Sequence, residues 1–260
     1  MINLKFSGVG SAFSPASLWQ TQGLLTSANG KVLLLDCGSD ARHSLRGMVQ
    51  TRDIDAVYIS HMHGDHVHGL EFLGFTTYFT PNMKKPTLFV VNGMDVPLWN
   101  HVLRGTMESV QGRMVTLHDY FDVHSIKPNK SFVWEEYTLT PIQTIHIMNG
   151  YVQVQSYGLM ITDGNRKIFL TSDTQFAPGT MSTFYNDADL IVHDCETMFR
   201  KDDDTGVRHP IKSGVHAHIA DLDTLPESVK NKMMLVHYQF IDLTYSFVEE
   251  QFVKIGEQIS

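Results

Sequence analysis

The sequence has few cysteines and no long apolar run. Of its 260 residues, only Cys37 and Cys195 are cysteines, which is too few for a disulfide framework, and they form no Cys-x-x-Cys pair. We therefore expect two small buried thiols without a metal or redox role, in a protein of the reducing cytoplasm. No apolar run reaches the roughly 18 residues of a membrane helix, so no membrane partner is expected. The N-terminus lacks a basic region followed by an apolar stretch, and we expect no signal peptide.

Positive charge is also scarce. The chain has 20 Lys and Arg residues against 28 Asp and Glu residues, which gives a formal net charge of −8. Binding of a long nucleic acid usually depends on a basic face that contacts many phosphates. We therefore expect no long nucleic acid as a partner, whereas a small anionic substrate remains open if bound metal ions supply the positive field.

Internal repeats and low-complexity linkers are missing as well. With 42% hydrophobic and 18% charged residues, the composition is typical of a globular protein and predicts one α/β domain over residues 1–260. Residues 114–125 show no clear period. Apolar or alternating stretches predict strands at 1–6, 23–26, 31–36, 54–59, 85–91, 132–134, 137–140, 142–147, 151–161, 167–170 and 190–192, and helices are expected at 41–49, 95–104 and 180–185.

The densest group of metal-binding side chains follows directly after one predicted strand. His61, His63, Asp65 and His66 occupy four of six consecutive positions. While the backbone is still extended, His61 and His63 point the same way and can bind one cation. Beyond the turn at Gly64, Asp65 and His66 face a second position. Imidazole and carboxylate donors suit zinc, so the spacing predicts a two-metal site. The alternative is a His-rich tract that chelates metal incidentally.

This His-x-His-x-Asp-His pattern resembles the signature of the metallo-β-lactamase superfamily. The resemblance implies an αββα four-layer sandwich, a helix at 68–78, and further ligands at later strand ends. His146, Asp173 and His237 each follow an apolar run in the expected order. Asp36, at an earlier strand end, is expected to orient a ligand histidine without binding metal itself. By resemblance, one zinc ion is held by His61, His63 and His146, the other by Asp65, His66 and His237, and Asp173 bridges them.

At several ligand positions the sequence differs from other superfamily members, and these differences exclude some of the reactions known in the superfamily. Asp173 stands where lactam-hydrolysing members usually carry a cysteine, and a carboxylate can bridge two hard metal ions. His63 stands where flavodiiron members have a glutamate, so redox chemistry at iron is not expected. The full set of seven ligands argues against a non-catalytic metal-binding protein, which is the least favoured alternative.

A second histidine-rich segment lies some twenty residues before His237. Phosphodiesterase members of the superfamily, including the tRNA 3′-processing endonuclease ribonuclease Z, have an extra histidine near this position that contacts the scissile phosphate. Two residues here could serve, and we expect His218 to do so in preference to His216. Asp65 would position or deprotonate the attacking water, and His218 would protonate the leaving oxygen. The alternative is a helix-flanking histidine without a catalytic role.

The spacing of the motifs favours a small substrate over tRNA. Ribonuclease Z carries a protruding arm between the equivalents of His146 and Asp173, and here that interval holds only an alternating strand, a turn and the next strand. The patterns Gly-Val-His-Ala-His, Asp-Leu-x-Thr-Leu-Pro and Leu-Val-His-Tyr resemble the anti-Pycsar proteins of phages and bacteria. The main alternative is a ribonuclease Z-like endonuclease, and another hydrolase of the same fold is also open.

The anti-Pycsar resemblance has specific implications. It implies hydrolysis of 3′,5′-cyclic mononucleotides such as cCMP, cUMP, cAMP and cGMP to nucleoside monophosphates by two zinc ions per chain. It also implies evasion of cyclic-nucleotide-based antiphage immunity, in the host cytoplasm if the protein is viral. Members of that family are homodimers in which an aromatic loop of one subunit helps to cover the site of the other.

Overall fold

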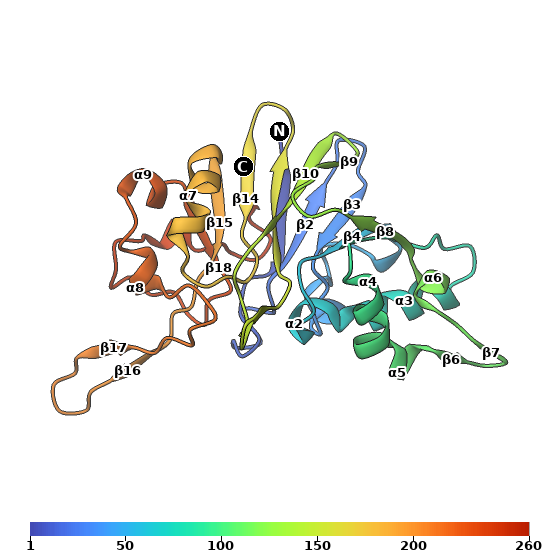
Figure 1. The fold of residues 1–260 in the computed structure, drawn as a ribbon, viewed down its shortest axis with the longest axis horizontal. Coiled ribbons are helices and arrows are strands. Elements are labelled where there is room, and N and C mark those ends of the chain that lie inside the picture. The colour runs from blue at the N-terminus through green and yellow to red at the C-terminus, as the bar shows by residue number, and fades with distance from the viewer. Residues whose placement is uncertain (260) are drawn as a thin grey trace.

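Two mixed β-sheets form the centre of the protein, with helices on both sides (Figure 1). The structure is a computed structural model and describes residues 1–259. The first sheet has seven strands in the order β19-β1-β2-β3-β4-β5-β8. Their bounds are β1 Asn3–Gly8, β2 Gln22–Thr26, β3 Val32–Leu35, β4 Ile54–Ile59, β5 Thr87–Val91, β8 Asp122–Ile126 and β19 Gln258–Ile259.

The second sheet has six strands in the order β18-β15-β14-β13-β10-β9. Two predicted antiparallel hairpins are confirmed, β2–β3 in the first sheet and β13–β14 in the second. The strands of the second sheet are β9 Phe132–Trp134, β10 Tyr137–Gln143, β13 Tyr157–Thr162, β14 Lys167–Leu170, β15 Leu190–Asp194 and β18 Met233–Val236.

The helices are short, and the longest one begins beside the histidine motif. This is α3 (Gly69–Phe79), which confirms the helix expected there. The others are α1 Ala41–Ser44, α2 Gly64–Val67, α4 Asp95–Pro97, α5 Arg104–Met107, α6 Leu117–Tyr120, α7 Pro178–Asp187, α8 Ile219–Leu222 and α9 Glu227–Lys230, with a π-helical turn at Leu98–Leu103 and 3₁₀ turns at Thr51–Asp53 and Glu249–Gln251.

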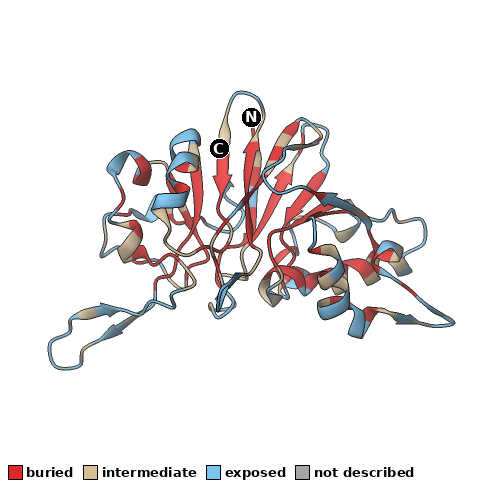
Figure 2. Ribbon diagram, in the orientation of Figure 1, coloured by how far each residue is buried: buried red, intermediate tan, exposed pale blue. Residues whose placement is uncertain are grey.

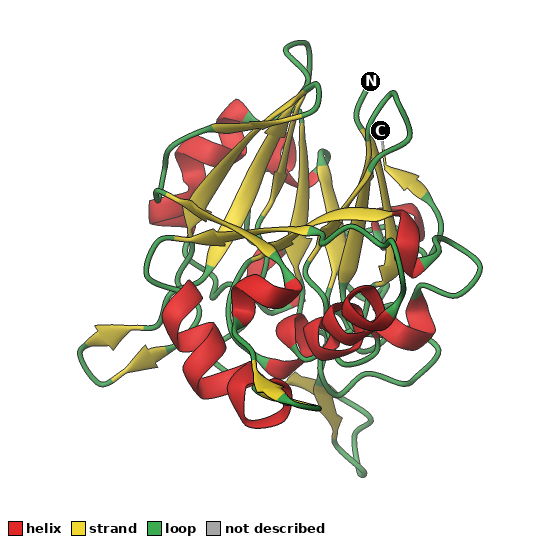
Figure 3. Ribbon diagram, turned by 90° about the vertical axis from the view of Figure 1, so that its right-hand side faces the viewer, coloured by secondary structure: helices red, strands yellow, loops and turns green. Residues whose placement is uncertain are grey.

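Strands β3 and β4 are buried on both faces because their side chains alternate between two hydrophobic cores. Leu33 and Tyr58 belong to the core shared by the two sheets. Leu34 and Val57 belong to a second core, which is formed with the helices on the outer face of the first sheet. A continuous apolar strand is what this double burial requires. The predicted αββα four-layer order is therefore confirmed. Figure 1 shows helices on either side of the sheets, and Figure 3, viewed from the right-hand side of Figure 1, shows helices in front of the strands.

Several local predictions differ from the structure. The helix expected at 41–49 ends at Ser44, and the one expected at 95–104 is divided into α4, the π-helical turn and α5. Strand β8 was not predicted, because its side chains are mostly exposed and polar; it is a strand because it pairs in parallel with β5. The small antiparallel hairpin β16–β17 (Phe199–Lys201 and Arg208–Pro210) was also not predicted.

Exposed two-stranded ribbons project from the buried sheets (Figure 2). They are β6–β7 (Ser109–Val110, Arg113–Met114), β11–β12 (Met148–Asn149, Val152–Gln153) and the hairpin β16–β17. Within residues 1–259, none of the helices combines the length and the apolar character that crossing a membrane would require.

The strand arrangement brings chemically active residues to one edge. Strands β3 and β4 are parallel neighbours, and so are β14, β15 and β18. Parallel neighbours present their carboxyl ends at the same edge of a sheet, where ligand sites of open α/β sheets occur. The residues that follow these ends, Asp36, Ser60, Thr171, Cys195 and His237, therefore begin the loops from which the site is built.

Candidate metal centre

The histidine motif begins in the connection after β4 and continues into α2, which contains Asp65 and His66. Three of its backbone groups are fixed by short contacts: His66 N–H donates to the carbonyl of His63 at 3.0 Å, and Cys37 N–H donates to the carbonyl of His66 at 2.8 Å. Gly38 lies so close to this loop that a Cβ atom there would come within 2.0 Å of the Asp65 carbonyl oxygen. Glycine is therefore required at position 38, since its lack of a side chain lets the strand end pack against the motif.

Three imidazole nitrogens of the first predicted ligand group converge. His63 Nδ1 is 3.1 Å from His61 Nε2 and 3.1 Å from His146 Nε2. Asp173 Oδ2 completes the group at 3.6 Å from the His61 nitrogen and 3.7 Å from the His146 nitrogen. A tetrahedral zinc ion with ligands at about 2.0–2.1 Å separates its ligand atoms by roughly 3.3–3.4 Å. The spacing of these four atoms therefore suits one zinc-sized cation.

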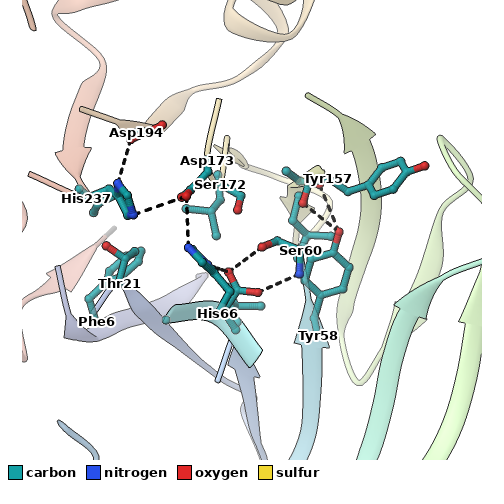
Figure 4. Close-up of a pocket in the computed structure, with 17 residues that line it drawn as sticks. Phe6, Thr21, Tyr58, Ser60, His66, Tyr157, Ser172, Asp173, Asp194 and His237 are labelled. Atoms are coloured by element: carbon teal, nitrogen blue, oxygen red, sulfur yellow. Dashed lines mark hydrogen bonds and ion pairs between the residues drawn. The ribbon is translucent and has the colours of Figure 1, made fainter. Parts of the chain in front are cut away.

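The second group has similar spacing and shares one atom with the first. Asp65 Oδ2 is 3.4 Å from His66 Nε2 and 3.5 Å from His237 Nε2. Asp173 Oδ2 is 3.3 Å and 3.5 Å from the same two nitrogens. Both nitrogens are buried and have no hydrogen-bond partner, an arrangement that is costly unless another group, such as a metal ion, interacts with them. Figure 4 shows this series of contacts from Asp194 through His237 and Asp173 to His66.

The electrostatics of the cluster call for positive charge. Burial lowers the pKa of His61 well below its usual value, which leaves a neutral ring with a free lone pair. Burial also lowers the pKa of His66, but the Asp173, Asp36 and Asp65 carboxylates outweigh it and raise that pKa well above the usual value. For His237, Asp173 and Asp194 outweigh burial in the same way and raise the pKa to about 10. Metal cations can supply the charge that protons otherwise provide.

Hydrogen bonds to the other ring nitrogens fix the orientation of three candidate ligands. His66 Nδ1–H donates to Asp36 Oδ2 at 2.8 Å, and His146 Nδ1–H donates to the Val215 carbonyl at 2.8 Å. His61 Nδ1 is 3.0 Å from Ser60 Oγ, which itself donates to Asp36. Partners of this kind set the tautomer and direction of metal-binding histidines. Asp36 thus lies where a residue that orients a ligand was expected.

Several strand ends at the site use a left-handed backbone. Asp36, Ser172 and His237 have φ values of 66°, 52° and 66°. L residues other than asparagine, aspartate and histidine rarely adopt this conformation, and strain of this kind is found mostly at functional sites. Asp36 and His237 themselves, and Asp173 directly after Ser172, supply side chains of the cluster or its hydrogen bonds.

Asp194, which the sequence analysis did not single out, joins the site from the end of β15. Its side chain is 1% exposed. Oδ2 accepts hydrogen bonds from His216 Nδ1 at 2.8 Å and from Thr174 N–H at 2.9 Å, and Oδ1 is 3.3 Å from His237 Nδ1. Like Asp173, it follows a run of apolar residues that forms a buried strand. That similarity is a signal from which the sequence could have identified it.

The structure places His216 at the cluster and His218 away from it, which corrects the preference for His218. His216 lines the cleft, and its ring centroid is 5.0 Å from that of His146 and 4.7 Å from that of His237. His218 caps α8, where Nδ1 accepts a hydrogen bond from Ala220 N–H, and Nε2–H donates to the Met198 carbonyl. Because the protein backbone occupies both of its ring nitrogens, His218 has none left for a phosphate.

All seven predicted ligands are therefore brought together, and their role as ligands stays a prediction. Five of them, His63, Asp65, His146, Asp173 and His237, line an open cleft with a volume of about 420 Å³, a size suited to a small molecule. The cleft is bordered by the loops that follow β1, β4, β10, β14, β15, β17 and β18. Its lining residues outside the ligand set are Ser11, Ala12, Phe13, Gly64, Glu196, Ser213, Val215, His216 and Gln239.

Comparison with known protein families gives one match along nearly the whole chain. Residues 2–259 match the family model described as Anti-Pycsar protein Apyc1. Among curated relatives, the Anti-Pycsar protein Apyc1 of Paenibacillus harenae is 33% identical, covering 91% of this chain and 90% of its own length. The protein of the same name from Bacillus phage vB_BveM-Goe7 is 30% identical, covering 90% of this chain and 88% of its own.

Solved structures similar to this chain have the metallo-β-lactamase fold. YhfI from Bacillus subtilis, named as a protein of that fold, gives a TM-score of 0.67 at 21% identity, over 91% of this chain and 86% of its own. The short form of human tRNase Z gives 0.64 at 19% identity, over 91% and 92%. Zn²⁺-bound PqqB from Methylobacterium extorquens gives 0.64 at 16% identity, over 91% and 89%. These likenesses confirm the predicted fold.

Replacing Asp36 by asparagine should weaken metal binding without unfolding the protein. Asparagine tolerates the left-handed backbone at this position but removes the charge that orients His66. Loss of such a partner typically lowers metal affinity by about 10–100-fold. Titration with a competing chelator measures the change, and Asp53→Asn, at an exposed carboxylate near the other end of the sheet, is the matched control. Equal affinities for wild type and Asp36→Asn would contradict this role.

Proposed function

The chain belongs to the Anti-Pycsar protein Apyc1 family, and from this premise we propose that it hydrolyses 3′,5′-cyclic mononucleotides to nucleoside monophosphates at a dinuclear zinc centre. The observation that carries the proposal is the position of Asp173 Oδ2, which lies 3.3–3.7 Å from four imidazole nitrogens in two groups. One oxygen shared by two ligand groups is the arrangement of a bridged metal pair. Metal pairs are used widely in the cleavage of phosphate esters.

Zinc is the metal that the donor set favours. Each group combines imidazole nitrogens with carboxylate oxygens, and no cysteine belongs to either of them among the described residues. The structurally similar PqqB was crystallised with Zn²⁺ bound, which is consistent with this choice. Two zinc ions, when bound, would polarise the phosphoryl oxygens and lower the pKa of a water molecule.

Asp65 and His216 are the residues proposed to move protons. Asp65 Oδ2 belongs to the second ligand group, and Asp65 would also position or deprotonate the attacking water. His216 uses Nδ1–H to bind Asp194, which leaves Nε2 as the nitrogen available to the cleft. In the reaction the water oxygen bonds to phosphorus, the bond from phosphorus to one ribose oxygen breaks, and His216 supplies a proton to that oxygen.

The loop that carries His216 is held in place by Glu196. Glu196 is 6% exposed, and its Oε2 accepts hydrogen bonds from Ser213 N–H at 2.9 Å and from Ser213 Oγ at 3.2 Å. The same loop presents the Val215 carbonyl to His146. By holding this loop, the Glu196 carboxylate helps to position both His146 and the proposed proton donor His216. We therefore assign Glu196 a positioning role.

The shape and charge of the protein support a cyclic mononucleotide in preference to tRNA. Between His146 and Asp173 the chain forms only the short ribbon β11–β12 and the strands β13 and β14. The net charge is −8, which disfavours the many phosphate contacts that tRNA binding needs. A cyclic mononucleotide has a single negative phosphodiester, which metal ions can neutralise without a basic surface.

The first test is the metal content. Protein purified without chelators and loaded with zinc should contain two zinc ions per chain by elemental analysis. His61→Ala and His237→Ala each remove a donor from a different group, so each should bring the content toward one ion per chain. Mainly iron in the wild type, or no more than one metal ion per chain, would contradict the dinuclear zinc centre.

The second test is the substrate. We expect hydrolysis of cCMP, cUMP, cAMP and cGMP to linear monophosphates, with weak dependence on ionic strength. A protein that makes 6–10 phosphate contacts loses about 10³–10⁵ in affinity between 50 and 200 mM salt, and no such loss is expected here. A tRNA precursor is the comparison substrate. Efficient, salt-sensitive removal of its 3′ trailer, together with inert cyclic nucleotides, would restore the endonuclease alternative.

The third test separates the two histidines. His216→Ala should lower kcat by about 10²–10⁴-fold, the usual contribution of general acid catalysis, at unchanged metal content. His218→Ala should instead cost about 1 kcal/mol of unfolding free energy, because it removes the cap of α8. Steady-state kinetics and urea unfolding of both variants measure these effects. A large loss of kcat in His218→Ala alone would reverse the assignment.

A further inference from the structure

One aromatic ring stands in the cleft without a role in the chemistry described so far. Phe13 is the single phenylalanine, tyrosine or tryptophan among the residues that line the cleft within the described chain, and it is 95% exposed. Isolated exposed hydrophobic residues are common on protein surfaces and carry no meaning by themselves. The significance of Phe13 therefore depends on its position in the cleft and on the turn that supports it.

Phe13 occupies the tip of a tight turn. The carbonyl of Ser11 accepts a hydrogen bond from Ser14 N–H at 3.2 Å, which makes Ala12 and Phe13 the two central residues. Ser14 Oγ accepts a second bond from Ser11 N–H at 2.7 Å. Such a doubly closed turn presents the side chain at its tip with little backbone freedom.

The turn is attached to the chain that carries a candidate metal ligand. Ser14 Oγ donates to the Tyr238 carbonyl at 2.9 Å, and Gln239 Nε2 donates to Ser11 Oγ at 3.0 Å. Both partners directly follow His237, whose own N–H donates to the Val9 carbonyl at 2.6 Å. The strand end that places the ligand therefore also positions the turn that carries Phe13.

We propose that Phe13 is a stacking platform for the nucleobase of the bound cyclic nucleotide, an inference that rests on the proposed function. With the phosphodiester at the metal centre, the base extends from the ribose toward the rim of the cleft. A phenyl ring carried on a fixed turn at the rim has few torsions left to order, so it binds a planar base at a small entropic cost. Every base has a π-face, so stacking helps to bind all four cyclic nucleotides without distinguishing between them. The ring belongs to the same chain as the metal ligands.

Substitution of the exposed ring tests the proposal directly. Phe13→Ala should raise KM for each of the four cyclic nucleotides by about 10–100-fold, as the loss of one base-stacking contact does elsewhere, with a much smaller change in kcat. Phe13→Tyr keeps the π-face and should stay close to wild type. Phe13→Leu keeps apolar area without the π-face and should behave like Phe13→Ala. Because Phe13 is exposed, these variants should keep the melting temperature of wild type.

A substrate without a base separates stacking from a general change in the cleft. The probe is 1-O-methylribose 3′,5′-cyclic phosphate, which keeps the sugar and the phosphodiester. Its KM should respond to Phe13→Ala by less than about threefold, because no base is present to stack. Phe79→Ala, at an exposed phenylalanine at the end of α3 outside the cleft, is the matched control and should leave all KM values unchanged.

Three outcomes would overturn the stacking role. One is a KM for Phe13→Leu equal to that of wild type, which would show that apolar contact suffices. Another is an equal rise in KM for the base-free probe, which would indicate a displaced loop. A wild-type enzyme that hydrolyses the base-free probe but no cyclic nucleotide also overturns it. A wild type inactive on every cyclic phosphodiester instead overturns the proposed function itself, so the two failures are distinguishable.

Discussion

A single carboxylate oxygen organises the centre of this protein. Asp173 Oδ2 lies within 3.3–3.7 Å of one nitrogen on each of four imidazole rings, and Asp173 itself is 3% exposed. Buried charges are stable only when they are balanced, because removing an ion from water costs several kcal/mol even after relaxation. The balance can come from protons or from metal ions. The neutral, convergent nitrogens of the first ligand group favour metal, since no proton satisfies three lone pairs that share one point.

The arrangement of the strands brings together the side chains that provide this balance. Strands from both sheets end at one edge, and each contributes a donor or a residue that orients one: Asp36 after β3, the histidine motif after β4, Asp173 after β14, Asp194 at the end of β15 and His237 after β18. Side chains in hydrophobic cores are closely packed, and the packing of the buried strands in both cores holds these strand ends in place. Loops then add the parts that differ among proteins of one fold, here His216 and the turn of Phe13.

The sequence predicts those parts of the site whose residues lie close together along the chain. Four ligands fall within six residues, so their spacing alone indicates a metal site, and the resemblance to a known family adds the three distant ones. Asp194 was missed because its one signal, an aspartate at the end of an apolar run, is too common to indicate a site by itself. The extent of the domain, the homodimer with its aromatic loop, the cytoplasmic location and the role in antiphage immunity all stay predictions, as each concerns relations that one chain does not contain.

The sequence by itself determined which side chains can donate to a metal ion and in what order most strands and helices follow one another. Side-chain type and hydrophobic alternation are properties of the sequence that do not depend on the fold. The tertiary structure decided which of two similar residues acts where. His216 and His218 are two positions apart in an irregular segment, where spacing does not set direction. A hydrogen bond to Asp194 holds His216 at the ligand cluster, while the Met198 carbonyl and the first turn of α8 hold His218 away. Asp194 and Met198 are distant in the sequence, so the choice between the histidines exists only in the folded chain.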